Sequence, residues 1–159
     1  MADTKTRGRE NKAAAGVAAS LNGFLANTYV LLAKTQACHW NATGPNFFGL
    51  HKLTEAQYGE LFEAIDVLAE RVRALDTMAP GGLNAILEKS TLDDSVGNVT
   101  TAEAAELLAK DNAFLSSDAK RIADEAEEAG DGATQDMLLE RVQAHDKAAW
   151  LLRSHLGAQ

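Results

Sequence analysis

Two histidines and three carboxylates in the first half of the chain have the types and spacing of metal ligands. They are His39, His51, Glu55, Asp66 and Glu70. The last four lie along residues 47–76, a segment whose pattern predicts one helix, and at about 100° per residue they fall within an arc of about 100°. Mixed imidazole and carboxylate ligands suit iron, zinc or manganese, and coordination positions left open favour redox turnover over a closed structural site.

These residues cannot all reach one ion along a single helix. His51 and Asp66 are fifteen residues apart, which is about 22 Å of helix, whereas ligand atoms lie about 2–2.6 Å from a metal. If two copies of the helix cross antiparallel about a two-fold axis, His51 of one chain meets Asp66 of the other, and the crossing falls near residues 58–59. Gly59 lies there, where a mid-helix glycine costs about 1 kcal/mol relative to alanine. We therefore expect a two-fold homodimer with two equivalent sites, with His39 reaching the His51 end.

A simpler interpretation stays open beside this one. Histidine and glutamate on a helix face are usually solvated or hydrogen-bonded, so the chain could be a helical interaction protein without a metal. One negative observation bears on where a metal site would lie. No glutamate has a histidine three residues on, although such Glu-x-x-His pairs hold the two metals inside a single helical bundle. Their absence favours a site between chains.

Helices that could position these residues are predicted from apolar residues recurring every three or four positions. They span about residues 12–42, 47–76, 100–130 and 133–156. The Gly44-Pro45 break ends the first, since the residue before proline avoids the α region. A capping box, Thr100-x-x-Glu103, begins the third, and Gly130 is a good residue to follow its end.

The second and third helices are joined by a long crossover, residues 77–100, in which residues 83–87 are expected to form a short helix. The predicted fold is therefore all-α: a four-helix bundle with one long crossover, which is the ferritin-like plan. We divide the chain into a flexible, polar and basic tail, residues 1–12, and a bundle, residues 13–157.

Composition limits the function classes. The net charge of −8 argues against the body as a nucleic-acid binder. One cysteine, Cys38, excludes an internal disulfide, and we expect it to be a small buried hydrophobe. No apolar run approaches the roughly 18 residues of a membrane span, and the first residues have no apolar signal core. We expect a soluble, cytoplasmic protein without a membrane partner, associated with the nucleoid if DNA is bound.

The site residues lie in motifs that resemble the Dps family, the mini-ferritins of starved bacteria, over nearly the whole chain. The segments that carry the resemblance are His39-Trp40-Asn41, the turn Gly44-Pro45-Asn46-Phe47-Phe48, His51, and Asp66-Val67-Leu68-Ala69-Glu70-Arg71. The resemblance implies that His39, His51 and Glu55 bind iron from one subunit, and that Asp66 and Glu70 bind it from the two-fold partner. Trp40 would lie beside the site and quench radicals. Position 55 departs from the family, where Asp is frequent.

The resemblance also implies a hollow homo-dodecamer, built from two-fold dimers. Such a cage would oxidise Fe(II), preferably with hydrogen peroxide rather than oxygen, store the ferric mineral inside, and so protect DNA from oxidative damage. No organic cofactor is implied. The family's three-fold pores lie near the acidic run within residues 100–130, and we predict Asp118 as a pore residue that concentrates Fe(II).

An alternative function is non-specific DNA binding and compaction by a nucleoid protein with minor metal chemistry. The predicted contacts are Lys5, Arg7, Arg9 and Lys12 in the tail, where four positive and two negative side chains sum to +2. Twelve tails could act multivalently, but against an acidic body we expect binding to be weak and sensitive to salt.

On the fourth helix, His145 falls on the core stripe and is expected to be a buried structural histidine.

Overall fold

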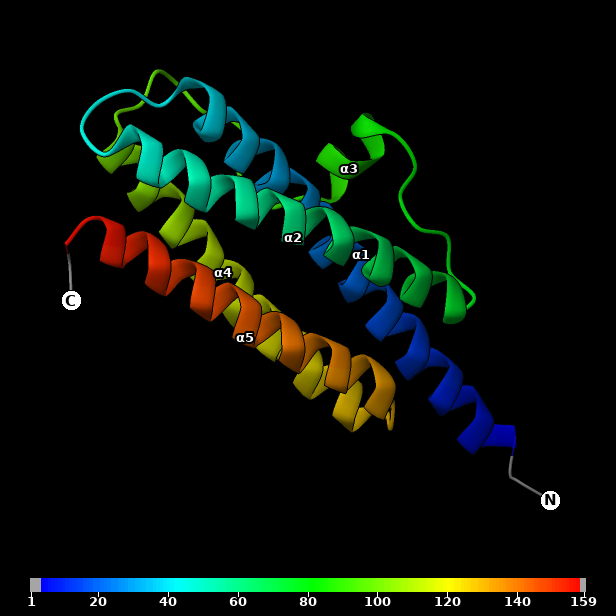
Figure 1. Cartoon of the computed structure of the whole chain (residues 1–159). Coiled ribbons are helices and arrows are strands. Elements are labelled where there is room, and N and C mark those ends of the chain that lie inside the picture. The colour runs from blue at the N-terminus through cyan, green and yellow to red at the C-terminus, as the bar shows by residue number, and fades with distance from the viewer. Residues whose placement is uncertain (1–3, 158–159) are drawn as a thin grey trace.

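Four long helices pack as two antiparallel pairs in the computed structural model, which describes residues 4–157, with side chains from residue 13 onward. The helices are α1 (Thr4–Asn41), α2 (Phe47–Ala74), α3 (Leu83–Lys89), α4 (Thr101–Glu128) and α5 (Gly132–His155). A crossover carrying α3 runs the length of the bundle, so that α2 and α4 point the same way (Figure 1). The predicted all-α bundle with a short helix on its crossover is confirmed.

Local sequence signals set most of the helix ends. Thr100 caps α4, its hydroxyl accepting a hydrogen bond from the Glu103 N–H at 3.2 Å while the Glu103 carboxylate accepts from the Thr100 N–H at 2.8 Å. This is the predicted capping box. Gly130 follows the end of α4 with a φ of 73°, a left-handed conformation that favours glycine. Gly44, in the break between α1 and α2, has a φ of 126°.

The start of α1 differs from the prediction. The helix begins at Thr4 rather than near residue 12, because residues 4–12 contain no proline and are mostly residues that a helix tolerates. The side chains of residues 4–12 and all of residues 1–3 lie outside the described part of the chain. The division into a flexible tail and a bundle, and the DNA-contact prediction for Lys5, Arg7, Arg9 and Lys12, therefore remain predictions.

Apolar stripes of all four long helices meet in one core. Its largest fully buried side chains include Leu21, Phe24, Leu31, Leu50, Leu68, Leu108, Leu115, Ile122, Leu138 and Leu152. Cys38 belongs to this core and is fully buried, as expected. By length and composition alone Ala13–Asn41 of α1 could cross a membrane, but 61% of its most apolar window is buried. The central place of α1 in the bundle explains its apolar character.

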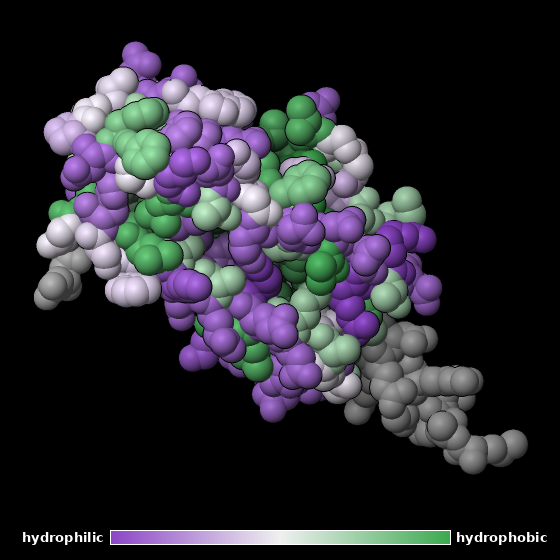
Figure 2. Space-filling view, in the orientation of Figure 1, coloured by the Kyte–Doolittle hydropathy of each residue, from purple (hydrophilic) through white to green (hydrophobic). Residues whose placement is uncertain are grey.

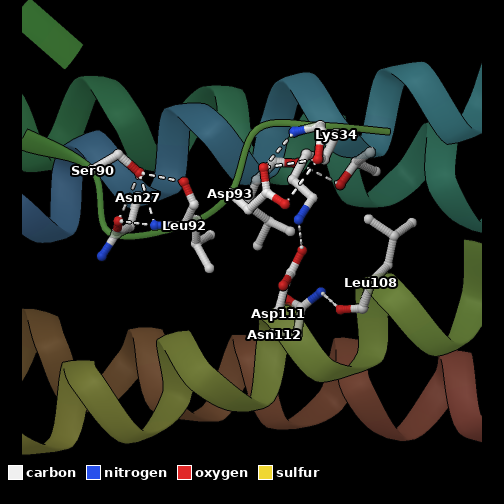
Figure 3. Close-up of polar contacts among 11 residues, drawn as sticks. Asn27, Lys34, Ser90, Leu92, Asp93, Leu108, Asp111 and Asn112 are labelled. Carbon is white, nitrogen blue, oxygen red and sulfur yellow. Dashed lines mark hydrogen bonds and ion pairs between the residues drawn. The ribbon is translucent and has the colours of Figure 1, made fainter. Parts of the chain in front are cut away.

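Polar side chains buried beside this core pair with one another (Figure 3). Lys34 on α1 and Asp111 on α4 form an ion pair with 2.5 Å between Nζ and Oδ2, and both are almost fully buried. The Asn27 side-chain oxygen accepts hydrogen bonds from the Ser90 hydroxyl at 2.9 Å and the Thr91 N–H at 2.8 Å. These contacts hold α4 and the segment after α3 against α1.

His145 is a buried structural histidine, as the core stripe predicts. Its ring is 1% exposed, and Nδ1 donates to the Asn112 side-chain oxygen at 2.9 Å. Burial, together with a smaller contribution from the positive charge of Arg141, lowers its pKa to about 3. Arg141 also pairs with the Glu60 carboxylate. The histidine is therefore neutral and its interactions lie within the bundle.

Candidate metal centre

His39 and His51 face each other where the end of α1 meets the start of α2. Their rings stack with centroids 3.8 Å apart and planes 16° apart. The backbone oxygen of His51 lies 2.9 Å from His39 Nδ1, and the backbone oxygen of His39 lies 3.1 Å from His51 Nδ1. Because a carbonyl oxygen only accepts, Nδ1 carries the proton in the neutral form of each ring. Each Nε2 therefore keeps a free lone pair, the form that binds metal.

Thr54 supports this arrangement from inside the bundle. Its side chain is fully buried, and its hydroxyl oxygen lies 3.2 Å from His39 Nδ1. The hydroxyl proton is donated to the Leu50 carbonyl oxygen at 2.8 Å. The His39 Nδ1–H thus has two acceptors, the His51 backbone oxygen and the Thr54 hydroxyl, and this bifurcated hydrogen bond limits rotation of the ring. Thr54 cannot be recognised from sequence spacing, because its contact with His39 depends on how closely α1 approaches α2.

Two aromatic rings enclose the imidazole pair. The Tyr58 ring meets the His39 ring edge-on, with centroids 5.2 Å apart and planes 81° apart. The Phe47 ring lies 5.3 Å from the His51 ring. Tyr58 was also missed, although its position seven residues after His51 puts it on the same helix face. Trp40, the residue after His39, is 65% exposed.

Glu55 lies one turn after His51 on the exposed side of α2. Its carboxylate accepts a hydrogen bond from Lys52 Nζ at 2.7 Å. That hydrogen bond is the main reason that the pKa of Glu55 is lowered, and the charge of Lys52 and the nearby imidazoles of His39 and His51 act in the same direction. Glu55 is therefore an ionised, solvent-accessible carboxylate close to the imidazole pair.

Asp66 and Glu70 are exposed further along α2 and are not brought to the histidines. The helix is continuous from Phe47 to Ala74, so the fifteen residues from His51 to Asp66 keep the ligand ends about 22 Å apart. Within the part of the chain whose side chains are described, no three His, Cys, Asp or Glu residues converge into a metal site. Within one chain, the predicted ligands therefore lie in two separate groups.

The carboxylate end of α2 is anchored to α5 through Arg71. Its Nη2 pairs with Asp131 at 2.5 Å, and its Nε donates to the Thr134 hydroxyl at 2.7 Å. Burial alone would raise the pKa of Asp131, but hydrogen bonds from Thr134 and the charge of Arg71 together lower it. Arg71 follows Glu70 directly, so these contacts fix the stretch of backbone that carries Glu70.

The predicted pore residue Asp118 is not a free carboxylate. Arg121 donates to it at 2.6 Å and also pairs with Glu125 on the same helix. This pairing raises the pKa of Arg121, chiefly through the hydrogen bond to Asp118. A pore role for Asp118 remains a prediction, and any field it contributes is partly offset by Arg121.

Apolar side chains are exposed along α2 and α3. Phe62 is 66% and Leu83 74% exposed, with Val67 and Leu87 about half exposed. Figure 2 shows hydrophobic atoms gathered over α3 among hydrophilic surroundings. Phe62 is eleven residues after His51, about 20° away around the helix, and so lies on the ligand face. At Gly59, close by, an added Cβ would meet nothing within 4 Å.

Comparison with known proteins matches this fold and these motifs. The ferritin-like domain model matches residues 18–158. The chain is 38% identical over 140 residues to the DNA protection during starvation protein of Brevibacillus brevis, covering 88% of this chain and 94% of that protein.

Two solved structures resemble it closely. Dps from Thermosynechococcus elongatus has a TM-score of 0.89 at 31% identity, covering 93% of this chain and 94% of that one. The Dps protein of Vibrio cholerae, described as a member of a broad superfamily of ferritin-like diiron-carboxylate proteins, has a TM-score of 0.87 at 27% identity, covering 92% of each chain. A bundle of this topology with this domain match is a ferritin-like protein. Within that class, the chain belongs to the Dps family.

Proposed function

We propose that this protein oxidises Fe(II) at sites shared between two chains and stores the ferric product inside a cage. His39, His51 and Glu55 of one chain bind the iron together with Asp66 and Glu70 of the partner subunit. The observation that carries the proposal is the imidazole pair, whose reciprocal hydrogen bonds to backbone carbonyls leave both Nε2 atoms free. Family membership supports the choice of iron over zinc or manganese.

The exposed apolar surface supports assembly through α2 and α3. Large apolar side chains exposed on one surface mark protein–protein contact sites, and here Phe62 lies between the predicted ligands on α2. The lack of a side chain at Gly59 lets another helix approach closely at the middle of α2. A two-fold antiparallel crossing there would cover Phe62 and bring each imidazole pair to the partner's carboxylates. We propose that such dimers build a hollow dodecamer.

The ligand types suit this reaction. Two Fe(II) ions each give one electron to one hydrogen peroxide molecule. The peroxide takes up two protons and becomes two water molecules, leaving two Fe(III) ions. Carboxylates offset the increased positive charge of Fe(III), and neutral imidazoles hold iron without adding charge. Using Fe(II) and peroxide together removes the reactants that form hydroxyl radicals. This would protect DNA chemically in the cytoplasm. The Brevibacillus brevis relative is named for DNA protection during starvation.

The test is to load the protein with Fe(II) without oxygen, add peroxide and follow ferric absorbance. We expect rapid oxidation by the natural chain and a sharply slower rate in the double variant His51→Ala with Asp66→Ala. A control, Asp124→Ala, removes an exposed carboxylate on α4, away from α2, and should leave the rate unchanged. An unchanged rate in the first double variant would refute the site.

Family membership also favours a second, weaker activity, non-specific contact with DNA through Lys5, Arg7, Arg9 and Lys12. A gel shift with and without residues 1–12, at low and moderate salt, tests it. Binding that is lost on truncation and on raising the salt is expected.

Size-exclusion chromatography tests the proposed cage, since a monomer or simple dimer would contradict it.

A further inference from the structure

A groove lies between α2 and α5, neighbouring helices that run antiparallel (Figure 1). Its volume is about 440 Å³, within the roughly 300–1,000 Å³ of small-molecule sites. The groove extends from residue 53 to 61 on α2 and from residue 143 to 151 on α5, which is about 12 Å of each helix. It therefore has the volume and the length to hold a molecule with an alkyl chain of moderate length.

The walls of the groove are mostly apolar. The apolar lining residues are Leu53, Ala56, Leu61, Ala144, Ala148 and Leu151. The three alanines are too short to fill the space between two helix backbones, and so leave it open. Buried Asn112 of α4 also lines the groove, but its amide donates to the Leu108 carbonyl oxygen at 2.8 Å and accepts from His145 at 2.9 Å. Asn112 therefore needs no hydrogen bond from a ligand, and an apolar chain can lie against it.

Two charged side chains line the groove, and their charges differ in how far they are compensated. Both carboxylate oxygens of Glu60 accept hydrogen bonds from the Arg141 guanidinium, so the negative charge is offset. Lys147 is exposed and forms no ion pair with any side chain that the structure describes. A ligand with a negative end would gain a partner in Lys147, whereas a positive end would be repelled.

The groove lies on the far side of α2 from the predicted iron ligands. At about 100° per residue, the α2 residues that line it are centred roughly 160° around the helix from the ligand face. A two-fold contact through the ligand face would therefore leave the groove uncovered. Binding in the groove does not depend on iron oxidation, so either proposal can fail without the other.

We propose that the groove between α2 and α5 binds a medium-chain carboxylate. The alkyl chain lies along the apolar walls, and the carboxylate pairs with Lys147 at the rim, where water still reaches it. Affinity rises with chain length until the groove is full, by at most about fourfold for each methylene buried. An alcohol of the same length gains from its chain alone.

The experiment is titration calorimetry of the full assembly with octanoate and, separately, with 1-octanol. We expect saturable binding of octanoate at one site per chain. Lys147→Gln should weaken octanoate binding by about threefold to fivefold, the range for an exposed ion pair, and leave 1-octanol binding unchanged. The control Lys120→Gln removes an exposed lysine on α4 and should leave both affinities unchanged.

A second variant, Ala56→Phe, fills the groove from its rim. Ala56 is exposed, so the larger ring need not enter the core, and binding of both octanoate and 1-octanol should be lost. Ala133→Phe, which changes an exposed alanine of α5 outside the groove, is the control and should bind both normally. Circular dichroism and size-exclusion chromatography check that each variant is folded and assembled.

Three results would overturn the inference. The natural chain could show no saturable binding of octanoate. Octanoate could bind Ala56→Phe as tightly as the natural chain, which would place it outside the groove. Octanoate could also bind Lys147→Gln with full affinity, which would mean that the groove does not recognise a carboxylate.

Discussion

The two ends of the ligand face on α2 differ in how far a single chain organises them. At the first end, His39 and His51 are stacked, hydrogen-bonded to each other's backbone and supported by buried Thr54. At the second end, Asp66 and Glu70 are exposed on the helix surface, and only the backbone beneath them is anchored, through Arg71. The predicted imidazole ligands are therefore held in place within one chain, whereas the predicted carboxylate ligands are exposed to solvent.

This difference has a physical reason. Neutral imidazoles can be buried at little cost when one nitrogen is hydrogen-bonded, whereas burying carboxylates without a cation is expensive. A single chain can therefore order the predicted imidazole ligands without a metal, whereas the predicted carboxylate ligands stay exposed to solvent. Under the proposed function, iron and a second chain would bring the two groups of ligands together.

The largest expected contrast is in stability. His39→Ala removes a buried, hydrogen-bonded ring and should lower the free energy of unfolding by about 3 kcal/mol, as well as slowing iron oxidation. Asp66→Ala removes an exposed carboxylate and should slow oxidation without lowering stability. Denaturant unfolding and peroxide-driven oxidation, measured on both variants, check this. Equal loss of stability in the two would remove the distinction between the ends.

Thr54 allows a finer test of the preorganised end. Thr54→Val keeps the shape but removes the hydroxyl near His39 Nδ1, and supporting residues of this kind typically contribute about 10–100-fold to metal affinity. We expect a drop at the low end of that range in anaerobic Fe(II) titration calorimetry, with most affinity recovered in Thr54→Ser. Full affinity in the valine variant would show that the carbonyl contacts suffice.

His145 is a histidine buried inside the bundle, and it should make the stability of the fold depend on pH. Its pKa is lowered from 6.5 to about 3, so it stays neutral in the folded chain where an unfolded chain would bind a proton. Stability should therefore fall as pH drops below about 6.5, by about 1.5 kcal/mol between pH 6.5 and 5 from this residue. Denaturant unfolding at several pH values should show a shallower decline for His145→Gln. An identical slope in that variant would mean that His145 is protonated in the fold.

The smallest effect is expected at Lys52, which pairs with Glu55 in the metal-free chain. Exposed ion pairs contribute little, so Lys52→Gln should raise Fe(II) affinity by no more than about threefold. Lys52→Arg, which keeps the charge, serves as the control. A large loss of affinity in Lys52→Gln would instead assign Lys52 a supporting role.

Much of the fold follows from local rules that a sequence displays. The Thr100 and Glu103 capping box, Gly130 after α4 and the core position of His145 all depend on residues within a turn or on one helix face. The start of α1 could not be predicted, because residues 4–12 are polar like a tail but contain no proline that would keep them out of the helix. The residue types of 4–12 are compatible both with a flexible tail and with an extension of the helix.

Only some of the candidate site residues could be predicted from the sequence. Spacing on one helix identified His51, Glu55, Asp66 and Glu70 as one face, and helix rise showed that they could not meet within one chain. The reciprocal His39 and His51 contacts depend on how two helices approach each other, which spacing does not encode. Thr54 and Tyr58 were missed for that reason.

Mixing two inactive variants tests most directly whether each site needs two chains. His51→Ala chains and Asp66→Ala chains are unfolded together, reassembled in equal amounts and assayed for peroxide-driven Fe(II) oxidation. In a mixed dimer one site carries both changes and the other carries neither, so random pairing should restore about a quarter of the natural sites. Recovery near that level is the result expected here. Activity no higher than that of either variant alone, from mixed assemblies of normal size, would contradict a shared site.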